Sequence, residues 1–342
     1  MEKLSSNNPD SLNFPLLYFF CPKYLFFLKD GKIELQVRKG TQKEELLEIF
    51  NKSVEDIPVF SSQKKHFSIE VSPRISKFQY INTIKKIKNH IQQGDIYEMN
   101  FCQEFFAEGV EVEPFEIYKK LIAVSPTPFS CYLHANKQYL ACASPERYLK
   151  KTGNKVISQP IKGTIKRGAN LEADENQKIK LKNDPKEQSE NVMIVDLVRN
   201  DLSRTAAKGS VKVDELFGIY SFKQVHHIIS TISSELKEGF DFVDLLKTTF
   251  PMGSMTGAPK IRAMEIIENY ESMKRGLFSG AAGYVTPKGD MDFNVVIRSI
   301  FYNSANKYLS FMAGSAITIN AQPESEYDEC ILKAKAIFSL FK

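Results

Sequence analysis

The sequence predicts an α+β fold, in which antiparallel strands and helices alternate along the chain. Many short runs rich in β-branched and aromatic residues are typical of strands, and segments with helical spacing lie between them. This interleaving favours α+β over a doubly wound parallel sheet. The length of 342 residues, with 42% apolar and 25% charged residues, is typical of a soluble globular protein with one large domain or two ordinary ones.

The sequence predicts a short N-terminal region, residues 1–73, which packs on a main domain at residues 74–342. Short strands and one helix around Gln42–Asn51 are expected in this region. The apolar stretch Leu12–Leu28 predicts two short aromatic-rich strands, because prolines interrupt it and it is shorter than the roughly 20 clean residues of a spanning helix. No cleavage-site pattern follows it, so we expect neither a membrane segment nor a signal peptide.

The main domain is expected to begin with a helix over Lys77–Gln93. Phe78, Ile81 and Ile84 recur there at helical spacing, and the pattern stops at Gly94. Strand-like runs follow at 97–107, 129–134, 138–143 and 155–158.

The second half of the main domain mixes helices and strands. A long charged segment, 170–183, precedes a strongly amphipathic helix through Val192–Val198. Further strands are expected at 211–213, 225–235, 280–286, 293–302 and 308–319. Further helices are expected at 242–250, 259–270 and 324–341.

Charge and cysteine content narrow the class of protein. The formal net charge of +5 is spread through the sequence with no basic tail, which argues against a nucleic-acid binder and allows a local cationic pocket for a small anion. The five cysteines are scattered without a Cys-x-x-Cys pair, which favours reduced thiols in a cytoplasmic protein.

The most informative segment is Pro160–Thr164, which holds a lysine in a tight peptide. Proline fixes φ on one side and glycine frees the backbone on the other, so we expect Lys162 at a bend. Sixteen residues upstream, the segment Ser144–Glu146 holds Glu146 behind a proline in a similar way. A positioned amine and a positioned carboxyl group can combine nucleophilic attack with general acid catalysis. A surface lysine in a turn is the alternative for this segment taken alone.

A glycine- and proline-rich loop, Phe250–Arg262, runs into a predicted helix. Its small residues allow backbone N–H groups to approach an anion, and the helix N-terminus adds favourable partial charge. The residue order of a P-loop is absent, and a structural turn is the alternative.

Two pairs of glutamates predict a site for a hard cation. Glu187 and Glu190 lie three residues apart at the head of a predicted helix, and Glu326 and Glu329 repeat this spacing near the C-terminus. Four carboxylates on two helices suit Mg²⁺, whereas no His or Cys array suggests zinc. A solvated acidic helix face is the alternative for either pair alone.

Basic residues near these acids suggest recognition of an anion. Arg298 is expected inside an apolar strand, where its charge needs either a substrate carboxylate or a buried structural salt bridge. Lys333 follows Glu329 by four residues on the same helix face. His226 and His227 are adjacent in a strand, so only one of them can face a site. The residues alone therefore predict an enzyme for a small polyanion that uses Mg²⁺.

These segments, in this order, resemble the chorismate-utilising enzymes, a family that includes the anthranilate, aminodeoxychorismate, isochorismate and salicylate synthases. The resemblance covers roughly residues 75–342. The matching stretches are 94–105, 144–146, 160–164, 190–204, 227, 253–262, 283–284, 297–298 and 326–329. The resemblance implies an α+β fold of large antiparallel sheets packed together, with helices on the outside.

Within this family, Lys162 resembles the aminodeoxychorismate synthase branch, because the branches that make anthranilate or isochorismate are similar to Pro-Ile-Ala-Gly-Thr at this place. The resemblance implies that Lys162 attacks ring carbon 2 of chorismate, that Glu146 protonates the departing 4-hydroxyl, and that ammonia adds at carbon 4. Because attack requires a neutral amine, we expect nearby cations or desolvation to lower the pKa of Lys162.

The resemblance also implies the remaining site residues. Glu190 and Glu329 match direct Mg²⁺ ligands, with Glu187 and Glu326 acting through water. Residues that match contacts to the substrate or line its site are Tyr284, Arg298, Gly314, Lys333, Thr256, Gly163, Thr164 and His227.

Glu98 departs from the family pattern, in which relatives that make amino products are similar to glutamine at this place and those that use water carry a lysine. We hypothesise that Glu98 pairs with Lys162 or accepts its proton, which adds Glu98 to the catalytic candidates. The N-terminal region is shorter than in many relatives, which makes a regulatory tryptophan pocket doubtful.

No cysteine lies in a Gly-x-Cys-x-Gly nucleophile turn, so we expect the chain to use free ammonia or ammonia from a separate glutamine amidotransferase subunit. Three other functions stay open: anthranilate synthase component I, a non-catalytic chorismate-binding subunit and, more remotely, a pyridoxal-phosphate enzyme.

Overall fold

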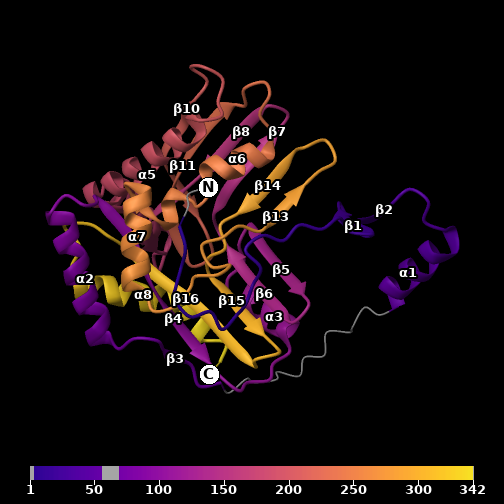
Figure 1. Cartoon of the computed structure of the whole chain (residues 1–342), viewed down its shortest axis with the longest axis horizontal. Coiled ribbons are helices and arrows are strands. Elements are labelled where there is room, and N and C mark those ends of the chain that lie inside the picture. Colours follow the sequence, from indigo (N-terminus) through magenta and orange to yellow (C-terminus); the bar gives the residue numbers. More distant parts are fainter. Residues whose placement is uncertain (1–3, 56–68, 342) are drawn as a thin grey trace. The chain divides into compact units, whose positions relative to one another are not determined.

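The computed structural model describes residues 4–55 and 69–341 (Figure 1). By its internal contacts the chain divides into two compact units, one made of residues 1–14 with 67–342 and the other of residues 15–66. Residues 4–14 belong to the larger unit, in which Leu12 and Phe14 are buried. The division of the chain after residue 73 stays a prediction.

The smaller unit contains a hairpin and a helix. Strands β1 (Tyr24–Lys29) and β2 (Lys32–Val37) pair antiparallel. The turn residues Asp30 and Gly31 both have positive φ, as a tight hairpin turn with the strands' own twist requires. Helix α1 (Lys43–Glu55) confirms the helix expected around residues 42–51. The prediction of two strands over residues 12–28 was wrong, since only β1 forms there. Pro15 and Pro22, which precede β1, lack the backbone N–H that strand pairing needs.

The larger unit is built on two antiparallel sheets. The first has the order β10-β11-β8-β7-β14-β13, with β9 also paired to β11. Its strands are β7 (Arg147–Thr152), β8 (Lys155–Gln159), β9 (Ile161–Lys166), β10 (Lys212–Ser221), β11 (Val225–Glu235), β13 (Gly283–Val285) and β14 (Met291–Asn294).

The second sheet has the order β12-β4-β16-β15-β6-β5, with β3 also paired to β4. Its strands are β3 (Ser72–Pro73), β4 (Glu98–Ala107), β5 (Phe129–Ala135), β6 (Gln138–Ser144), β12 (Gly257–Ala258), β15 (Ser299–Asn303) and β16 (Tyr308–Ile317). The α+β prediction with large antiparallel sheets is confirmed.

Both faces of the second sheet are buried, and its strands divide their residues between two cores. Along β4, Met99, Phe101 and Phe105 pack into an outer core, which lies under the helices. Cys102 belongs to a second core, which the two sheets form together. This alternation follows the two-residue period of a strand. By the same period Glu98 lies on the face of β4 that meets the first sheet.

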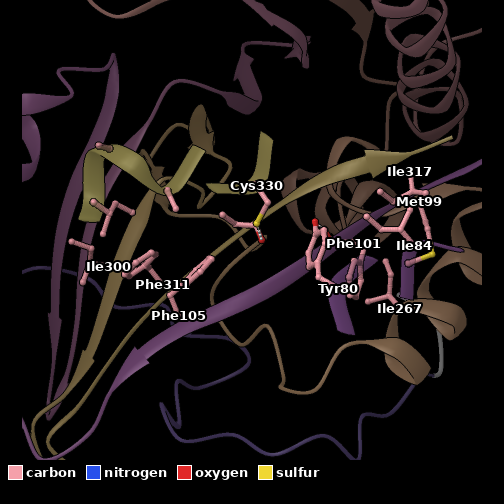
Figure 2. Packing of buried hydrophobic residues seen from close by; sticks show 14 of the residues in the cluster. Tyr80, Ile84, Met99, Phe101, Phe105, Ile267, Ile300, Phe311, Ile317 and Cys330 are labelled. Atoms are coloured by element: carbon pink, nitrogen blue, oxygen red, sulfur yellow. Dashed lines mark hydrogen bonds between the residues drawn. The ribbon is translucent and has the colours of Figure 1, made fainter. Parts of the chain in front are cut away.

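The outer core is rich in aromatic side chains (Figure 2). The rings of Tyr80 in helix α2 (Lys77–Gln92) and Phe101 lie 4.9 Å apart, and Phe105 stacks on Phe311 of β16 at 5.3 Å, both measured between ring centroids. These contacts fix α2 and the strand ladder against each other.

The helices of the larger unit lie on the outside of the sheets (Figure 1). Helix α8 packs on β16 and α2 packs on α8, whereas α5 packs on β9 and β11. The helices are α2 (Lys77–Gln92), α3 (Pro114–Val124), α4 (Leu171–Lys182), α5 (Pro185–Ser203), α6 (Phe242–Thr249), α7 (Lys260–Tyr270) and α8 (Pro323–Phe338), with a 3-10 turn η1 (Gly253–Met255). Among the described residues no helix is long and apolar enough to cross a membrane.

Candidate functional site

Lys162 lies inside strand β9 and not at the bend that its flanking proline and glycine predicted. Its side chain is buried, with only 8% of the residue exposed. Gly163 follows with φ +92°, and a Cβ there would come within 2.9 Å of Ile228 Cδ1 and 3.1 Å of Glu187 Oε2. Glycine is therefore required next to the lysine by both backbone angle and space.

Carboxylates from the second sheet and from α5 surround the Lys162 ammonium. Its Nζ lies 3.9 Å from Glu98 Oε2 and 4.0 Å from Glu190 Oε2. Burial by itself would lower the pKa of Lys162, but the charges of Glu98, Glu190, Glu329 and Glu187 together raise that pKa above its usual value. The expectation of a lowered pKa is wrong, because the nearby charges are acids and not cations.

Glu98 begins β4 and is completely buried. Both of its carboxylate oxygens lack a hydrogen-bond partner among the described residues. A buried carboxylate without hydrogen bonds is costly, so its closeness to Lys162 is its main compensation. This geometry fits the expected pairing of the two side chains.

Glu146 lies where the chain leaves β6 and enters β7, and so passes from one sheet to the other. Ser144 Oγ accepts a hydrogen bond from the Glu146 backbone N–H (3.2 Å) and donates one to the Val295 carbonyl (2.6 Å), which fixes this turn. Ser254 Oγ donates to Glu146 Oε1 at 2.7 Å. Burial raises the pKa of Glu146 to about 7, although Ser254 and the Lys162 charge oppose the rise. The carboxyl group is thus prepared to hold a proton near neutral pH.

A cavity of about 20 Å³ borders Glu146 and Ser254 on the side of α5. This volume suits a single water molecule and not a ring-shaped substrate. We therefore do not identify this cavity with a substrate site.

Glu187 and Glu190 lie on α5, and Glu326 and Glu329 lie on α8, as the sequence predicted for their helices. Burial, together with the neighbouring glutamates, raises the pKa of Glu187 to about 7, and burial also raises the pKa values of Glu190 and Glu326. Glu329 differs, since Lys333 lowers its pKa through an ion pair of 2.7 Å. The junction of the two helices is therefore both acidic and largely buried.

Lys186 stands between the two acidic pairs. Its Nζ lies 3.8 Å from Glu190 Oε1 on its own helix and 3.4 Å from Glu326 Oε1 on α8. Lys186 was not among the site residues predicted from sequence, although its spacing of four residues before Glu190 places the two side chains on one helix face.

The residues at this junction fit a hard divalent cation in their donor chemistry. They offer carboxylate oxygens from two helices, and Glu190 Oε1 is buried without a hydrogen-bond partner in the described part of the chain. As they stand, no three His, Cys, Asp or Glu side chains among the described residues lie close enough to hold a metal ion.

Arg298 lies in the segment between β14 and β15, with φ +53°, and not within a strand. The predicted strand over residues 293–302 was wrong at its centre. The apolar run continues through residues 295–298, which lie outside both strands, and hydrophobicity does not reveal this interruption. Burial lowers the pKa of Arg298, and the Glu329 charge opposes this shift.

The two histidines of β11 face opposite ways, as predicted. His226 Nε2 lies 2.8 Å from Asp174 Oδ1, whereas His227 Nδ1 lies 2.8 Å from Thr164 Oγ1 on β9. Burial, followed by the charge of Arg298, lowers the pKa of His227 to about 3. His227 is therefore neutral at physiological pH and can act there as a hydrogen-bonding group.

The other predicted contact residues lie on several elements, and the structure does not bring all of them to this cluster. Lys333 Nζ donates to the Gly314 carbonyl at 3.0 Å, and a Cβ at Gly314 would collide with the Phe101 carbonyl at 2.0 Å. Thr256 is buried, and its carbonyl accepts the Asn100 N–H at 2.8 Å. Tyr284 lies on the edge strand β13 with 62% of the residue exposed.

Two further residues supporting the site were missed from sequence. Ser254 lies in the glycine-rich loop that the sequence did mark, and it contacts Glu146 as described above. Arg275 Nη1 donates to the Met255 carbonyl (2.6 Å), and its Nη2 donates to the Asn100 carbonyl (2.9 Å) and pairs with Glu271 Oε1 (2.6 Å). Nothing in the local pattern around Arg275 predicts these long-range contacts.

Comparison with known proteins decides the family. The family model described as chorismate binding enzyme matches residues 1–339. The chain belongs to the chorismate-binding enzyme family. Among curated members, aminodeoxychorismate synthase component 1 of Bacillus subtilis (strain 168) is 38% identical over 75% of the chain and 54% of the relative. Anthranilate synthase component 1 of Aquifex aeolicus (strain VF5) is 36% identical over 83% of the chain and 55% of the relative. The chain thus spans about half the length of these relatives.

Solved members of the chorismate-binding family share the fold. Anthranilate synthase component I of Streptococcus pneumoniae TIGR4 superposes with a TM-score of 0.84 at 28% identity, over 98% of this chain and 76% of that one. The menaquinone-specific isochorismate synthase of Escherichia coli superposes at 0.77 with 18% identity, over 94% of this chain and 75% of that one, which shows the fold alone.

Proposed function

We propose that the chain is the component I of an aminodeoxychorismate synthase, which converts chorismate and ammonia to 4-amino-4-deoxychorismate for folate synthesis. The observation that carries this proposal is the buried amine of Lys162. By the family resemblance, this position is alanine in the branches that make anthranilate or isochorismate.

In the proposed reaction Lys162 Nζ bonds to ring carbon 2 while the bond from carbon 4 to its hydroxyl breaks. Glu146 gives its proton to that hydroxyl, which leaves as water. Ammonia then bonds to carbon 4, the bond from carbon 2 to Lys162 breaks, and the enolpyruvyl group stays in place. The raised pKa of Glu146, about 7, supports its role as the acid.

Lys162 must lose a proton before it can attack, because carboxylates raise its pKa in the ligand-free protein. Glu98 is a suitable acceptor, since its Oε2 lies 3.9 Å from Nζ and makes no hydrogen bond within the described chain. We therefore assign Glu98 to the transfer of this proton.

Glu190 and Glu329 are proposed to hold Mg²⁺ directly, with Glu187 and Glu326 acting through water. When bound, the ion would neutralise and orient a carboxylate of the substrate. Burial is the main cause of the raised pKa values of Glu187, Glu190 and Glu326, and it supports a cation at this place, since a bound cation would compensate carboxylates that are removed from water.

The remaining proposed residues bind the substrate. Arg298 and Lys333 supply positive charge to its carboxylates, and neutral His227 offers a hydrogen bond. The other residues assigned to binding are Tyr284, Gly314, Thr256, Gly163 and Thr164.

A separate glutamine amidotransferase subunit is proposed as the source of ammonia, and the complex is placed in the cytoplasm. The component numbering of the relatives supports a partner subunit.

Anthranilate synthase component I is the second candidate function, because relatives of that name match almost as well. The product separates the two, since anthranilate has lost pyruvate and 4-amino-4-deoxychorismate has not. We propose to supply chorismate, Mg²⁺ and ¹⁵N-ammonium and to identify the product by mass spectrometry.

The expected product retains the enolpyruvyl group and carries one ¹⁵N. Labelled anthranilate would transfer the assignment to the second candidate. Binding of chorismate by isothermal titration without any turnover would favour a non-catalytic subunit instead.

A further inference from the structure

We infer that Lys186 is an internal counter-cation, which neutralises the carboxylates of α5 and α8 in the metal-free protein and competes with the divalent metal for them. This inference rests on the metal site of the proposed function. It adds a residue that neither the glutamate spacing nor the family resemblance had assigned.

The position of Lys186 needs an explanation because it lies in the first turn of α5, directly after Pro185. The N-terminus of a helix carries positive partial charge, so a lysine there is unfavourable by itself. The N-cap Asp184 offsets part of this, since its Oδ1 accepts the backbone N–H groups of Lys186 and Glu187 at 2.9 and 3.2 Å. The Lys186 ammonium does not turn back to this cap but reaches the carboxylates farther along.

The contacts of Lys186 join two helices. Its Nζ lies 3.8 Å from Glu190 Oε1 on α5 and 3.4 Å from Glu326 Oε1 on α8. Glu190 Oε1 makes no hydrogen bond within the described residues, so the lysine compensates it by charge alone. One ammonium thus faces oxygens from both acidic pairs, which are the groups proposed to hold the metal.

The other cations of the cluster pair with single members of the carboxylate set, and among the described residues neither forms an ion pair with Glu326. Lys333 pairs with Glu329 and donates to the Gly314 carbonyl, and Lys162 divides its charge between Glu98 and Glu190. Without Lys186, Glu326 and Glu190 would lose their shared cationic neighbour at the helix junction.

The Lys186 ammonium is also able to move away from the carboxylates. Its side chain is 42% exposed, so the ammonium can move into water when a divalent ion takes the carboxylates. The same lysine therefore stabilises the metal-free protein and lowers its affinity for metal. A purely structural salt bridge would not show this pair of opposite effects.

The test is a titration of the metal-free chain with Mn²⁺, followed by electron paramagnetic resonance, on the wild type and Lys186→Met. We expect Lys186→Met to bind Mn²⁺ roughly tenfold more tightly, because the competing charge is gone. Its melting temperature in the presence of a chelator should fall, and the rise in melting temperature on adding Mg²⁺ should exceed that of the wild type.

Two controls separate the outcomes. Lys182→Met removes an exposed lysine near the end of α4 and should bind Mn²⁺ like the wild type. Glu190→Gln should weaken Mn²⁺ binding more than tenfold, because it removes a proposed ligand. Should Lys186→Met fail to fold, Lys186→Gln replaces it in the same titration.

Unchanged or weaker Mn²⁺ binding in the Lys186 variants, with Glu190→Gln impaired, would overturn the inference and leave the proposed function standing. Absence of saturable Mn²⁺ binding in the wild type would overturn both the inference and the metal site of the proposed function.

Discussion

Burial prepares the Glu146 carboxyl group to give up a proton near neutral pH. A solvent-exposed glutamate is ionised at pH 7, whereas Glu146 is 3% exposed and has its pKa raised to about 7. The short segment Ser144–Glu146 fixes its backbone, and Ser254 orients its Oε1. The residue pattern predicted a positioned acid, but the burial that sets its pKa comes from distant loops.

The first prediction concerns the pH dependence of Glu146. Turnover should fall as pH rises above about 7, because the acid is lost, and Glu146→Gln should be nearly inactive at every pH. Since the folded pKa lies above the unfolded value, unfolding stability should decrease by up to about 3 kcal/mol between about pH 4.5 and pH 7. Urea unfolding of the wild type and Glu146→Gln across this range checks the effect, and the fall should be smaller in the variant by this amount, since Glu187, whose pKa is also raised to about 7, contributes a separate fall. A wild type whose rate stays flat to pH 9 would contradict the assignment.

The second prediction concerns Glu98, whose two oxygens lack hydrogen-bond partners among the described residues. Glu98→Gln should lower the rate by roughly 10²-fold or more, because an amide cannot take the proton of Lys162. The loss should be smallest at high pH, where solvent removes that proton. Rate measurements from pH 6 to 10 check this. Full turnover of the variant across that range would exclude the role.

At the scale of elements, the buried Arg275–Glu271 pair connects the site loop to β4. The guanidinium of Arg275 holds carbonyls of both Met255 and Asn100, while Glu271 Oε1 also accepts the Cys102 N–H at 2.9 Å. These bonds therefore fix the loop that carries Ser254 relative to the strand that carries Glu98.

The third prediction follows from this pair. Arg275→Met should destabilise the protein by about 3–5 kcal/mol, since it leaves the Glu271 carboxylate buried and unpaired. Denaturant unfolding measures the change. As a control, Arg262→Met breaks the exposed pairs with Glu265 and Asp95 and should destabilise the protein far less. Equal losses in the two variants would show that the buried pair has no special role.

Most helices and several strands of the larger unit could be predicted from periodicity. The helix over residues 77–93 and the strands near 129–134 and 138–143 were correct within one or two residues, because each has a strong repeating pattern and a clear stop. Strands β7 and β9 and helix α3 were not predicted, and the charged segment over residues 170–183 was not predicted to be helix α4. β9 contains Lys162 and Gly163, which favour a turn locally, and only its pairing with β11 makes it a strand.

The site was predictable to a similar degree. The spacing of the glutamates predicted two acidic helix faces correctly, since helical period alone decides that. The raised pKa of Lys162 could not be predicted, because it depends on which side chains a second sheet and two helices bring around it. Local sequence can therefore identify candidate residues, but long-range packing determines their pKa values.

At the scale of the whole molecule, the site draws its groups from two sheets and two helices. Lys162 and His227 come from the first sheet, Glu98 from the second, and Glu146 from the segment that connects them. The core shared by the two sheets keeps these groups in place, so function depends on how the sheets pack.

The fourth prediction concerns the nitrogen source. The purified chain should use ammonium but not glutamine, because none of its five cysteines lies in a nucleophile turn for glutamine hydrolysis. Glutamine should support turnover only after a glutamine amidotransferase subunit is added. Product formation from both nitrogen sources, measured with and without that subunit, checks this. Glutamine-dependent turnover by the chain alone would contradict it.

The most direct test of the central claim is the rate of ¹⁵N-ammonium incorporation into chorismate by Lys162→Ala, set against Lys166→Ala. Lys166 is an exposed lysine on the same strand and serves as the matched control. We predict that Lys162→Ala loses at least about 10³-fold in rate while still binding chorismate, and that Lys166→Ala keeps nearly full activity. Equal rates for Lys162→Ala and the wild type would contradict the account.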